Sequence, residues 1–569
     1  MIQAFNENDL WPGDCPELLI VGPPGTGKTH MVLTSYVWPV LDAGGTVLAT
    51  SYTRAAAGEL RDRSAKRFGC EPSEFKDQLS TIHSEAYRRC RHMGLRIRRN
   101  KDDSIEQEDI DRLGQLAALE AVRDGDYKAG WEIVRQVWPD DIGLSPRKRL
   151  SRLFQGVNLS EAERFVMMDL HGRYDEDGRL VNPDFTSLLE LALQDGSGRK
   201  VDLLAVDESQ DLTPLEWRLV DRWALDADRV LVVGDPDQAI YGWSGADGAR
   251  LMRWVRDGRP ARRLAKSWRV PSTAHALSRS VVRRVSDRID APYEPSERPG
   301  SVSVHWGPSV WATAQEAQEA GGTCLVLSRT NQGCTDAVAD LLDLGIPHIA
   351  ERGKPQILRP DGLSMRIASC LMDWLGRMVP TKSANARALI DSLSSRGPLL
   401  KGRRGLKTLM VKALSEMDGP VSVEWLHASG LDWRLMAEQF EEPADGWWES
   451  ALLPRADADS IMAVRDWLID YGDGDALMEA ARRVVVVTAH GSKGREADVV
   501  IVDARKSVPM WSKRCDKGSL QTDRQRIDED LRCLYVAVTR TKDRLEILRG
   551  GDGKPDWLGV HGIVVDRRA

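Results

Sequence analysis

The stretch Gly22-Pro23-Pro24-Gly25-Thr26-Gly27-Lys28-Thr29 decides the fold of this chain of 569 residues. It follows the apolar run Glu17 to Val21 and precedes a helix-prone stretch. A glycine-rich loop between a strand and a helix lets backbone N–H groups close around a polyphosphate at the helix N-terminus. The full eight-residue pattern in this context predicts a phosphate-binding loop.

The last two residues of the loop carry its chemistry. We expect Lys28 to reach the terminal phosphates of a nucleoside triphosphate and the Thr29 hydroxyl to ligate Mg²⁺. ATP and Mg²⁺ are therefore the expected ligands. The loop alone leaves kinases, GTPases and motor proteins open.

Composition is that of an ordinary water-soluble protein, with 42% hydrophobic and 29% charged residues. No apolar run reaches the roughly 18 residues needed to cross a bilayer, and the N-terminus lacks the features of an export signal. We expect a cytoplasmic protein with no membrane partner. The eight cysteines are scattered without the close spacing of a metal site. The net charge of −7 argues against nucleic-acid binding through global charge, but a groove needs positive charge only locally.

Short apolar runs bounded by turn residues fall in two groups and indicate buried parallel strands. The first group is 17–21, 46–49, 203–206 and 230–233, and the second is 324–327, 484–487 and 499–502. Helix-prone stretches lie between them, which favours two doubly wound α/β domains. Each group is interrupted by a mostly helical stretch, over about 87–184 in the first and about 353–482 in the second.

Two acidic motifs follow predicted strands of the first group. Asp207 and Glu208 come at the end of the run 203–206, where Asp207 is suited to hold the metal and Glu208 to orient and deprotonate the attacking water. Gln238 follows the run 230–233 and can hydrogen-bond both that water and a γ-phosphate oxygen. Tyr241 and Trp243 come soon after it, a spacing that can link phosphate state to a surface on which bases stack.

At this point the chain resembles the UvrD/Rep/PcrA group of superfamily 1 helicases, and the match runs through the whole chain in order. The segments that carry it beyond the loop and the acidic box are Thr50 to Ala56, Thr81 to Ser84, Asp184-Phe185 with Leu188-Leu189, Gly234 to Trp243, Ser267-Trp268-Arg269, Ser328 to Asn331, Thr488 to Glu496 and Tyr535 to Lys542. The resemblance implies two RecA-like P-loop NTPase domains, each with a mostly helical insertion.

The resemblance implies the boundaries of these domains and of their insertions. The first RecA-like domain is expected over 1–86 and 185–258 with its insertion at 87–184, the second over 259–352 and 483–550 with its insertion at 353–482, and a C-terminal tail over 551–569.

The resemblance also implies roles at the nucleotide. Arg269 and Arg540 would contact the γ-phosphate as arginine fingers. Glu496 would hydrogen-bond the ribose, and the Trp268 ring would stack on adenine in place of the family's tyrosine. His30 stands where the family usually has arginine after the loop, and Ser244 replaces the arginine that commonly follows the tryptophan of the Gly234 to Trp243 segment.

A further set of residues resembles the family's contacts with single-stranded DNA. Aromatic positions would stack on bases and the others would touch the backbone; these residues are Tyr52, Thr81, His83, Tyr241, Trp243, His490 and Lys493. We therefore expect an ATP-dependent helicase that moves 3′ to 5′ on single-stranded DNA and acts at duplex junctions. The alternative is a DNA-gated ATPase subunit of a nuclease, recombination or defence complex that does not unwind DNA by itself. An RNA helicase also stays open, because these contacts do not distinguish the 2′-OH.

Overall fold

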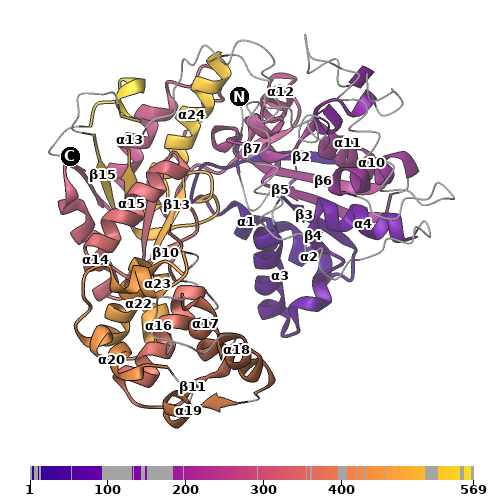
Figure 1. The fold of residues 1–569 in the computed structure, drawn as a ribbon. Coiled ribbons are helices and arrows are strands. Elements are labelled where there is room, and N and C mark those ends of the chain that lie inside the picture. Colours follow the sequence, from indigo (N-terminus) through magenta and orange to yellow (C-terminus); the bar gives the residue numbers. More distant parts are fainter. Residues whose placement is uncertain are drawn as a thin grey trace. The chain divides into compact units, whose positions relative to one another are not determined.

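The computed structural model describes residues 3–5, 10–11, 15–52, 54–92, 131, 134–141, 148–149, 184–196, 198–290, 292–353, 355–358, 362–394, 406–417, 419–428, 431–454, 456–506, 523–550 and 556–565. The chain divides into two compact units (Figure 1). The N-terminal unit is Met1–Pro299 with Pro509–Thr539, and the C-terminal unit is Gly300–Val508 with Arg540–Ala569. Most of the predicted insertion at 87–184 and part of the predicted tail lie outside the described residues.

The N-terminal unit contains a parallel sheet of seven described strands, in the order β1-β7-β2-β6-β5-β3-β4. The strands are β1 (Gln3–Ala4), β2 (Glu17–Val21), β3 (Val47–Ser51), β4 (Leu79–Thr81), β5 (Val201–Asp207), β6 (Ala227–Gly234) and β7 (Ala261–Arg263). Its four longest strands overlap the four runs predicted for the first domain, and only β3 begins one residue later than its predicted run.

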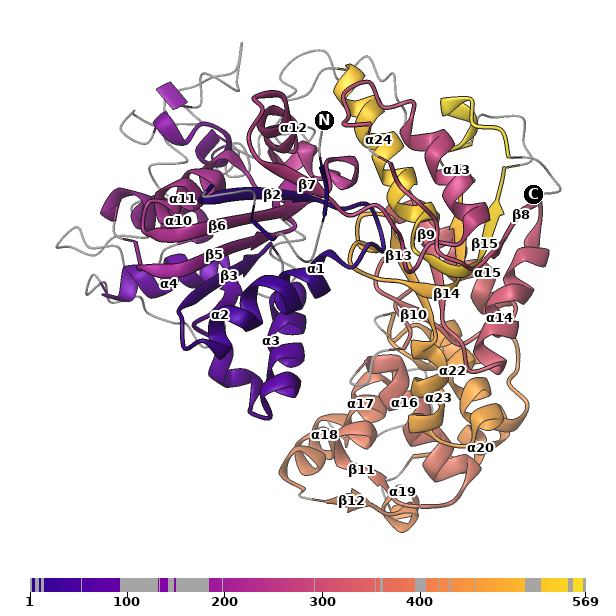
Figure 2. The same cartoon turned by 180° about the vertical axis from the view of Figure 1, so that it is seen from behind.

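Helices cover both faces of this sheet, because alternate residues of its strands are apolar on either side. Leu18 and Ile20 of β2 belong to one buried cluster, and Leu19 and Val21 to another. The helical elements of the unit are α1 (Lys28–Met31), the π-helical η1 (Val32–Val37), α2 (Trp38–Asp42), α3 (Arg54–Phe68), η2 (Pro72–Phe75), α4 (Ile82–His92), η3 (Pro139–Asp141), α10 (Phe185–Asp195), η4 (Ser209–Asp211), α11 (Pro214–Ala224), η5 (Pro236–Gln238), η6 (Gly242–Ser244), α12 (Ala249–Arg256), α13 (Ser272–Val282) and α24 (Asp523–Val538). The unit is thus a doubly wound α/β domain (Figure 2).

The C-terminal unit contains a second parallel sheet, with the described strands in the order β10-β13-β9-β14-β15-β8. They are β8 (Ser301–His305), β9 (Cys324–Ser328), β10 (Ile349–Ala350), β13 (Val484–Thr488), β14 (Ala497–Asp503) and β15 (Thr541–Leu548), with η7 (Pro308–Val310), α14 (Trp311–Glu319), α15 (Asn331–Asp343) and η10 (Gly559–His561). The predicted fold class, two parallel α/β sheets each with helices, is confirmed.

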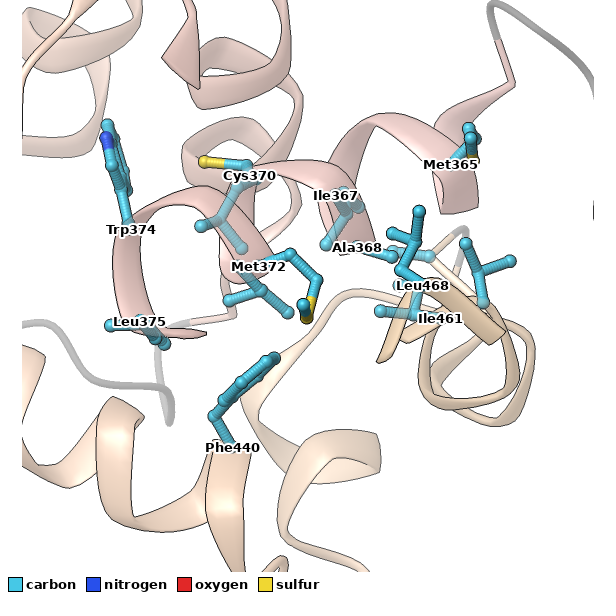
Figure 3. Packing of buried hydrophobic residues seen from close by; sticks show 14 of the residues in the cluster. Met365, Ile367, Ala368, Cys370, Met372, Trp374, Leu375, Phe440, Ile461 and Leu468 are labelled. Carbon is cyan, nitrogen blue, oxygen red and sulfur yellow. The ribbon is translucent and has the colours of Figure 1, made fainter. Parts of the chain in front are cut away.

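A mostly helical body joins β10 to β13 in the sequence. Its elements are α16 (Leu363–Leu371), the π-helical η8 (Met372–Gly376), α17 (Ser383–Ser392), α18 (Leu406–Glu416), α19 (Val423–Ala428), α20 (Trp433–Glu441), α21 (Trp447–Ala451), α22 (Ala458–Tyr471) and α23 (Gly474–Arg482), with a short antiparallel pair of β11 (Thr381–Lys382) and β12 (Pro420–Val421). Figure 3 shows its own core, in which Met372, Leu375 and Phe440 approach one another. Trp374 is fully buried there and donates its indole N–H to Val421 O at 3.1 Å.

Within each sheet, a threonine that precedes one strand is hydrogen-bonded to an aspartate near the amino end of the neighbouring strand. Before β3, Thr46 donates its N–H and hydroxyl to Asp202 Oδ2 at 2.6 and 2.8 Å. Before β9, Thr323 donates the same two groups to Asp498 Oδ2 at 2.9 and 2.8 Å. These hydrogen bonds lie at the amino ends of the strands, so they do not occupy the opposite edge, where the carboxyl ends of the strands lie. In the part of the chain that the structure describes, no helix has the length and apolarity to cross a membrane.

Candidate functional site

The candidate site lies at the carboxyl ends of β2, β5 and β6, which are neighbours in the first sheet. The glycine-rich loop follows β2, Asp207 ends β5, and Asp235 follows β6. Because parallel strands all point the same way, these segments meet at one edge. The predicted loop, acidic box and Gln238 segment are therefore brought together by the sheet itself.

Lys28 begins α1 and is buried, with 9% of its surface exposed. Its Nζ donates to the Gly22 carbonyl oxygen at 2.6 Å. A Cβ at position 22 would lie 2.6 Å from Lys28 Cγ and 2.7 Å from Thr26 Oγ1, so only glycine fits there. The loop thus turns tightly around the lysine stem, as a phosphate-binding loop requires.

Thr29 and Asp207 are in direct contact. The Thr29 hydroxyl donates to Asp207 Oδ2 at 2.9 Å, and the Glu208 N–H donates to Asp207 Oδ1 at 2.9 Å. Burial raises the pKa of Asp207, the charge of Glu208 raises it further, and Lys28 opposes the shift. The half-buried Thr29 hydroxyl and the buried Asp207 carboxylate, whose charged form is favoured by nearby positive charge, fit Mg²⁺, which prefers oxygen ligands.

Glu208 has an unusual backbone conformation, with φ of 52° in the left-handed region. Such conformations cost about 1–3 kcal/mol at a non-glycine residue and persist only when the surroundings fix them. Here the surrounding contact is Gln210, which donates from Nε2 to Glu208 Oε2 at 2.6 Å and accepts from the Asp235 N–H at 3.0 Å. A Cβ at Gly234 would lie 2.6 Å from Gln210 Oε1, so glycine at that position lets the bridge form.

Gln238 lies at the end of η5 and is buried. Its Nε2 donates to Asp235 Oδ2 at 2.6 Å. Burial raises the pKa of Asp235, and the charge of Lys28 opposes this shift. Gln238 is thereby held by a carboxyl group that, like that of Asp207, interacts with the charge of Lys28.

The Ser267 to Arg269 segment packs on the loop from within the N-terminal unit. Ser267 Oγ donates to Pro24 O at 3.0 Å, and the Trp268 N–H donates to Gly25 O at 2.8 Å. Gly25 has φ of 72°, and a Cβ there would lie 2.7 Å from Arg269 Cβ. These contacts explain why residues 259–299 cluster with the N-terminal unit, although the sequence prediction gave them to the second domain.

The Trp268 side chain lies at the surface, with 66% of the residue exposed. Lys266 Nζ lies 4.8 Å from the centroid of its ring and pairs with Glu297. A flat, accessible indole beside the loop is the kind of surface on which a base stacks.

An aromatic surface lies at the same edge of the sheet, after β3, β4 and η5. The rings of Tyr52 and Tyr241 are 5.8 Å apart, and those of Tyr241 and Trp243 are 6.3 Å apart. The His83 ring meets the edge of Phe185 at 5.2 Å. The structure therefore brings the predicted DNA-contacting aromatic residues of this unit together. Thr81 at the end of β4 is buried, and its hydroxyl shares a hydrogen bond with Ser84.

Four predicted site residues lie in the C-terminal unit. His490 and Lys493 follow the carboxyl end of β13. Glu496 and Arg540 precede β14 and β15, whose first residues are paired. Glu496 forms an ion pair with Lys542 at 2.9 Å, and buried Arg540 donates to the Arg495 carbonyl oxygen at 3.4 Å.

Three further residues of the N-terminal unit touch the predicted ones. Gln210 follows Glu208 by two positions, and Phe185 is aromatic beside Asp184, so both had a signal in the sequence. No signal in the sequence indicated that Glu216 would contact a predicted DNA-binding residue. Thr213-x-x-Glu216 is a helix capping box, and that function alone accounts for a glutamate at this position. In the structure Glu216 Oε1 also lies 3.8 Å from His83 Nδ1.

Comparison with known proteins gives matches in both units. Residues 14–244 match the model of an AAA domain, and residues 469–549 match that of a UvrD-like helicase C-terminal domain. DNA helicase II of Salmonella typhimurium is 26% identical over 292 residues, which cover 48% of this chain and 39% of that protein. ATP-dependent DNA helicase PcrA of Bacillus subtilis is 28% identical over 269 residues, which cover 43% of this chain and 34% of that protein.

A longer match is to the probable DNA helicase II homolog of Rickettsia conorii, which is 24% identical over 613 residues, covering 93% of this chain and 90% of that protein. In the Salmonella and Bacillus matches the chain spans less than half of the length of the relative.

Glu216 gives a test of the electrostatics of this surface. Burial raises the pKa of Glu216 to about 7, although hydrogen bonds from Thr213 lower it. A carboxyl group whose pKa is raised on folding stabilises the fold below its unfolded pKa and loses that contribution as the pH rises through 7. We expect Glu216→Gln, which keeps an acceptor for the Thr213 N–H, to stabilise the protein by about 1–3 kcal/mol at pH 8 and by less towards pH 5.

Thermal unfolding across this pH range measures the effect. Glu85 supplies the matched control, because it is equally buried but paired with Arg88 and Arg89. Glu85→Gln should destabilise the protein at pH 8, because it removes the buried carboxylate that pairs with both arginines. Equal losses in both variants at pH 8 would contradict the account.

Proposed function

We propose that this chain, a member of the UvrD-like group of superfamily 1 helicases, hydrolyses ATP in response to single-stranded DNA and moves along that strand in the 3′ to 5′ direction. One observation carries the proposal. The phosphate-binding loop, the acidic box, Gln238 and an aromatic surface lie at one edge of one sheet. A nucleotide and a strand of DNA could each influence the same few segments there.

ATP hydrolysis would use residues of this edge in distinct roles. Lys28 would neutralise charge on the β- and γ-phosphates, and Thr29 with Asp207 would hold Mg²⁺. The bound metal would supply a Lewis acid that polarises the phosphoryl oxygens. Glu208 would orient the attacking water and accept its proton, and Gln210 would hold that carboxylate through its 2.6 Å hydrogen bond. Gln238 would contact the γ-phosphate.

The remaining nucleotide contacts are assigned by the same proposal. Trp268 would stack on the base, since its ring is accessible beside the loop, and His30 would lie next to the phosphates in the first turn of α1. Arg269 and Arg540 would stabilise the charge that develops on the γ-phosphate. Glu496 would hydrogen-bond the ribose.

DNA would bind through stacking and backbone contacts. Tyr52, Tyr241 and Trp243 would stack on bases, each worth about 1–3 kcal/mol and indifferent to sequence. Phe185 joins this set because its ring meets that of His83. The backbone contacts would come from Thr81, His83, His490 and Lys493. A protein with this activity would work in the cytoplasm on single-stranded DNA and duplex junctions, with partners in repair, replication or defence.

The direction of movement and the ability to unwind are tested with duplexes that carry either a 3′ or a 5′ single-stranded tail. We expect ATP-dependent strand displacement from the 3′ tail, because loading and movement both need a free strand of that polarity. Displacement from the 5′ tail alone would overturn the proposal. ATP hydrolysis stimulated by DNA without displacement from either tail would favour the DNA-gated regulatory subunit instead; no observation in the described residues favours that alternative.

Two substitutions test the nucleotide chemistry. Lys28→Ala removes the buried cation and Glu208→Gln removes the proton acceptor, and each should lower DNA-stimulated ATP hydrolysis by at least about a hundredfold. Steady-state phosphate release with and without single-stranded DNA measures this. Asp202→Asn is the matched control, because Asp202 lies at the amino edge of the same sheet, and it should retain at least about half of the rate. Full turnover in both site variants would refute the assignment.

A further inference from the structure

Arg288 has no part in the site described so far, yet it touches the turn that carries Gln238. It lies in the loop that follows α13, and only 10% of its side chain is exposed. Its Nη2 donates to Asp237 Oδ2 at 2.8 Å, and its Nη1 donates to Asp290 Oδ1 at 2.8 Å. Asp237 belongs to η5 and directly precedes Gln238. A buried guanidinium therefore fixes the residue next to the proposed phosphate sensor.

The η5 turn is held from two sides. On one side the Asp237 N–H donates to Asp235 Oδ1 at 3.0 Å, and Gln238 Nε2 donates to Asp235 Oδ2 at 2.6 Å. On the other side stands Arg288. Desolvation lowers the pKa of Arg288, but the hydrogen bond and charge of Asp237 outweigh it, so the pKa is raised and the group stays a cation. Shifting η5 would require this buried ion pair to move or break.

Residues 286 and 287 of the same loop are hydrogen-bonded to α24. Ser286 donates its N–H to Asp528 Oδ1 at 3.0 Å and its hydroxyl to Asp528 Oδ2. Arg532 Nη2 donates to the Asp287 carbonyl oxygen at 2.7 Å. In both views α24 lies beside α13 (Figures 1 and 2). The helix ends at Val538, two residues before Arg540.

A small pocket marks where these elements meet. It is lined by Pro23 of the loop, Asp237 of η5, Arg288, and the rings of Tyr293 and Tyr535. Tyr293 donates its hydroxyl to Pro24 O at 3.0 Å, and Tyr535 belongs to α24. The phosphate-binding loop, η5 and α24 thus converge on the loop that carries Arg288.

We propose that Arg288 is a positioning residue for ATP hydrolysis, which ties the η5 turn to α24 so that the Gln238 side chain is held in one orientation. The inference rests on the proposed function. Arg288 acts through Asp237 and touches neither nucleotide nor DNA. The guanidinium fork suits this task, because it reaches two carboxylates at once, which a lysine ammonium does less well.

The test compares Arg288→Ala, Arg288→Lys and Asp237→Ala with the double variant Arg288→Ala/Asp237→Ala. Arg288→Ala should lower the DNA-stimulated kcat about 10- to 100-fold while the KM for ATP changes less than about threefold, because orientation rather than binding is lost. Arg288→Lys should fall between it and the unmodified protein. The double variant should recover thermal stability, since no buried charge is left unpaired, but its kcat should stay as low as that of Arg288→Ala.

Two more variants test whether Arg288 acts by connecting η5 to α24 or only through its local contact with Asp237. Asp528→Asn breaks the α24 end and should also lower kcat, and combining it with Arg288→Ala should lower kcat no further, because both break the same connection. Asp290→Asn is the control: Asp290 also binds Arg288, but it is 77% exposed and does not touch η5, so kcat should stay within about twofold.

The outcomes are distinguishable from failure of the proposed function. If the unmodified protein shows no DNA-stimulated hydrolysis, the proposed function is wrong, and the inference, which rests on it, is wrong as well. If that hydrolysis is present and kcat returns with stability in the double variant, Arg288 is only a structural ion pair. Unchanged kcat in Arg288→Ala, or fully additive losses with Asp528→Asn, would equally overturn the inference.

Discussion

The parallel register of β2, β6, β5 and β3 is the constraint on which the N-terminal unit depends. It ends four strands at one edge and places buried Lys28 near two buried carboxyl groups, those of Asp207 and Asp235. Burial raises the pKa of both carboxyl groups, and the charge of Lys28 opposes both shifts. The charge of Lys28 therefore acts on both acidic segments, and further positive charge at this edge would favour the ionised form of both carboxyl groups.

The hydrogen bonds around this edge explain why its backbone is fixed. Glu208 keeps a left-handed conformation, and Gln210 bridges its carboxylate to the N–H of Asp235. Gly234 is needed because a larger residue would push Gln210 away. The acidic box and the Gln238 turn are consequently joined by hydrogen bonds into one connected structure. Preorganised groups of this kind give electrostatic catalysis its strength.

Much of this could be predicted from the sequence, for identifiable reasons. The central strands are continuous apolar runs, and the loop is a local pattern with a local geometry. Two strands inside the sheets were missed: β7 is only Ala261–Arg263 and carries two arginines, and β15 (Thr541–Leu548) has charged residues at its second to fourth positions, so neither reads as a buried strand. Contacts such as Glu216 with His83 depend on tertiary packing and leave no periodic signal. The assignments of site residues stay predictions.

The most direct measurement is the initial rate of ATP hydrolysis by the unmodified chain, with Mg²⁺ present, at zero and at saturating oligo-dT. The proposed nucleotide and DNA contacts lie on segments of one sheet edge, so binding of a single strand is expected to alter the rate at the nucleotide site. We predict at least about a tenfold increase in rate, which corresponds to about 1.4 kcal/mol of transition-state stabilisation. A rate that is substantial without DNA and unaffected by it would contradict the account.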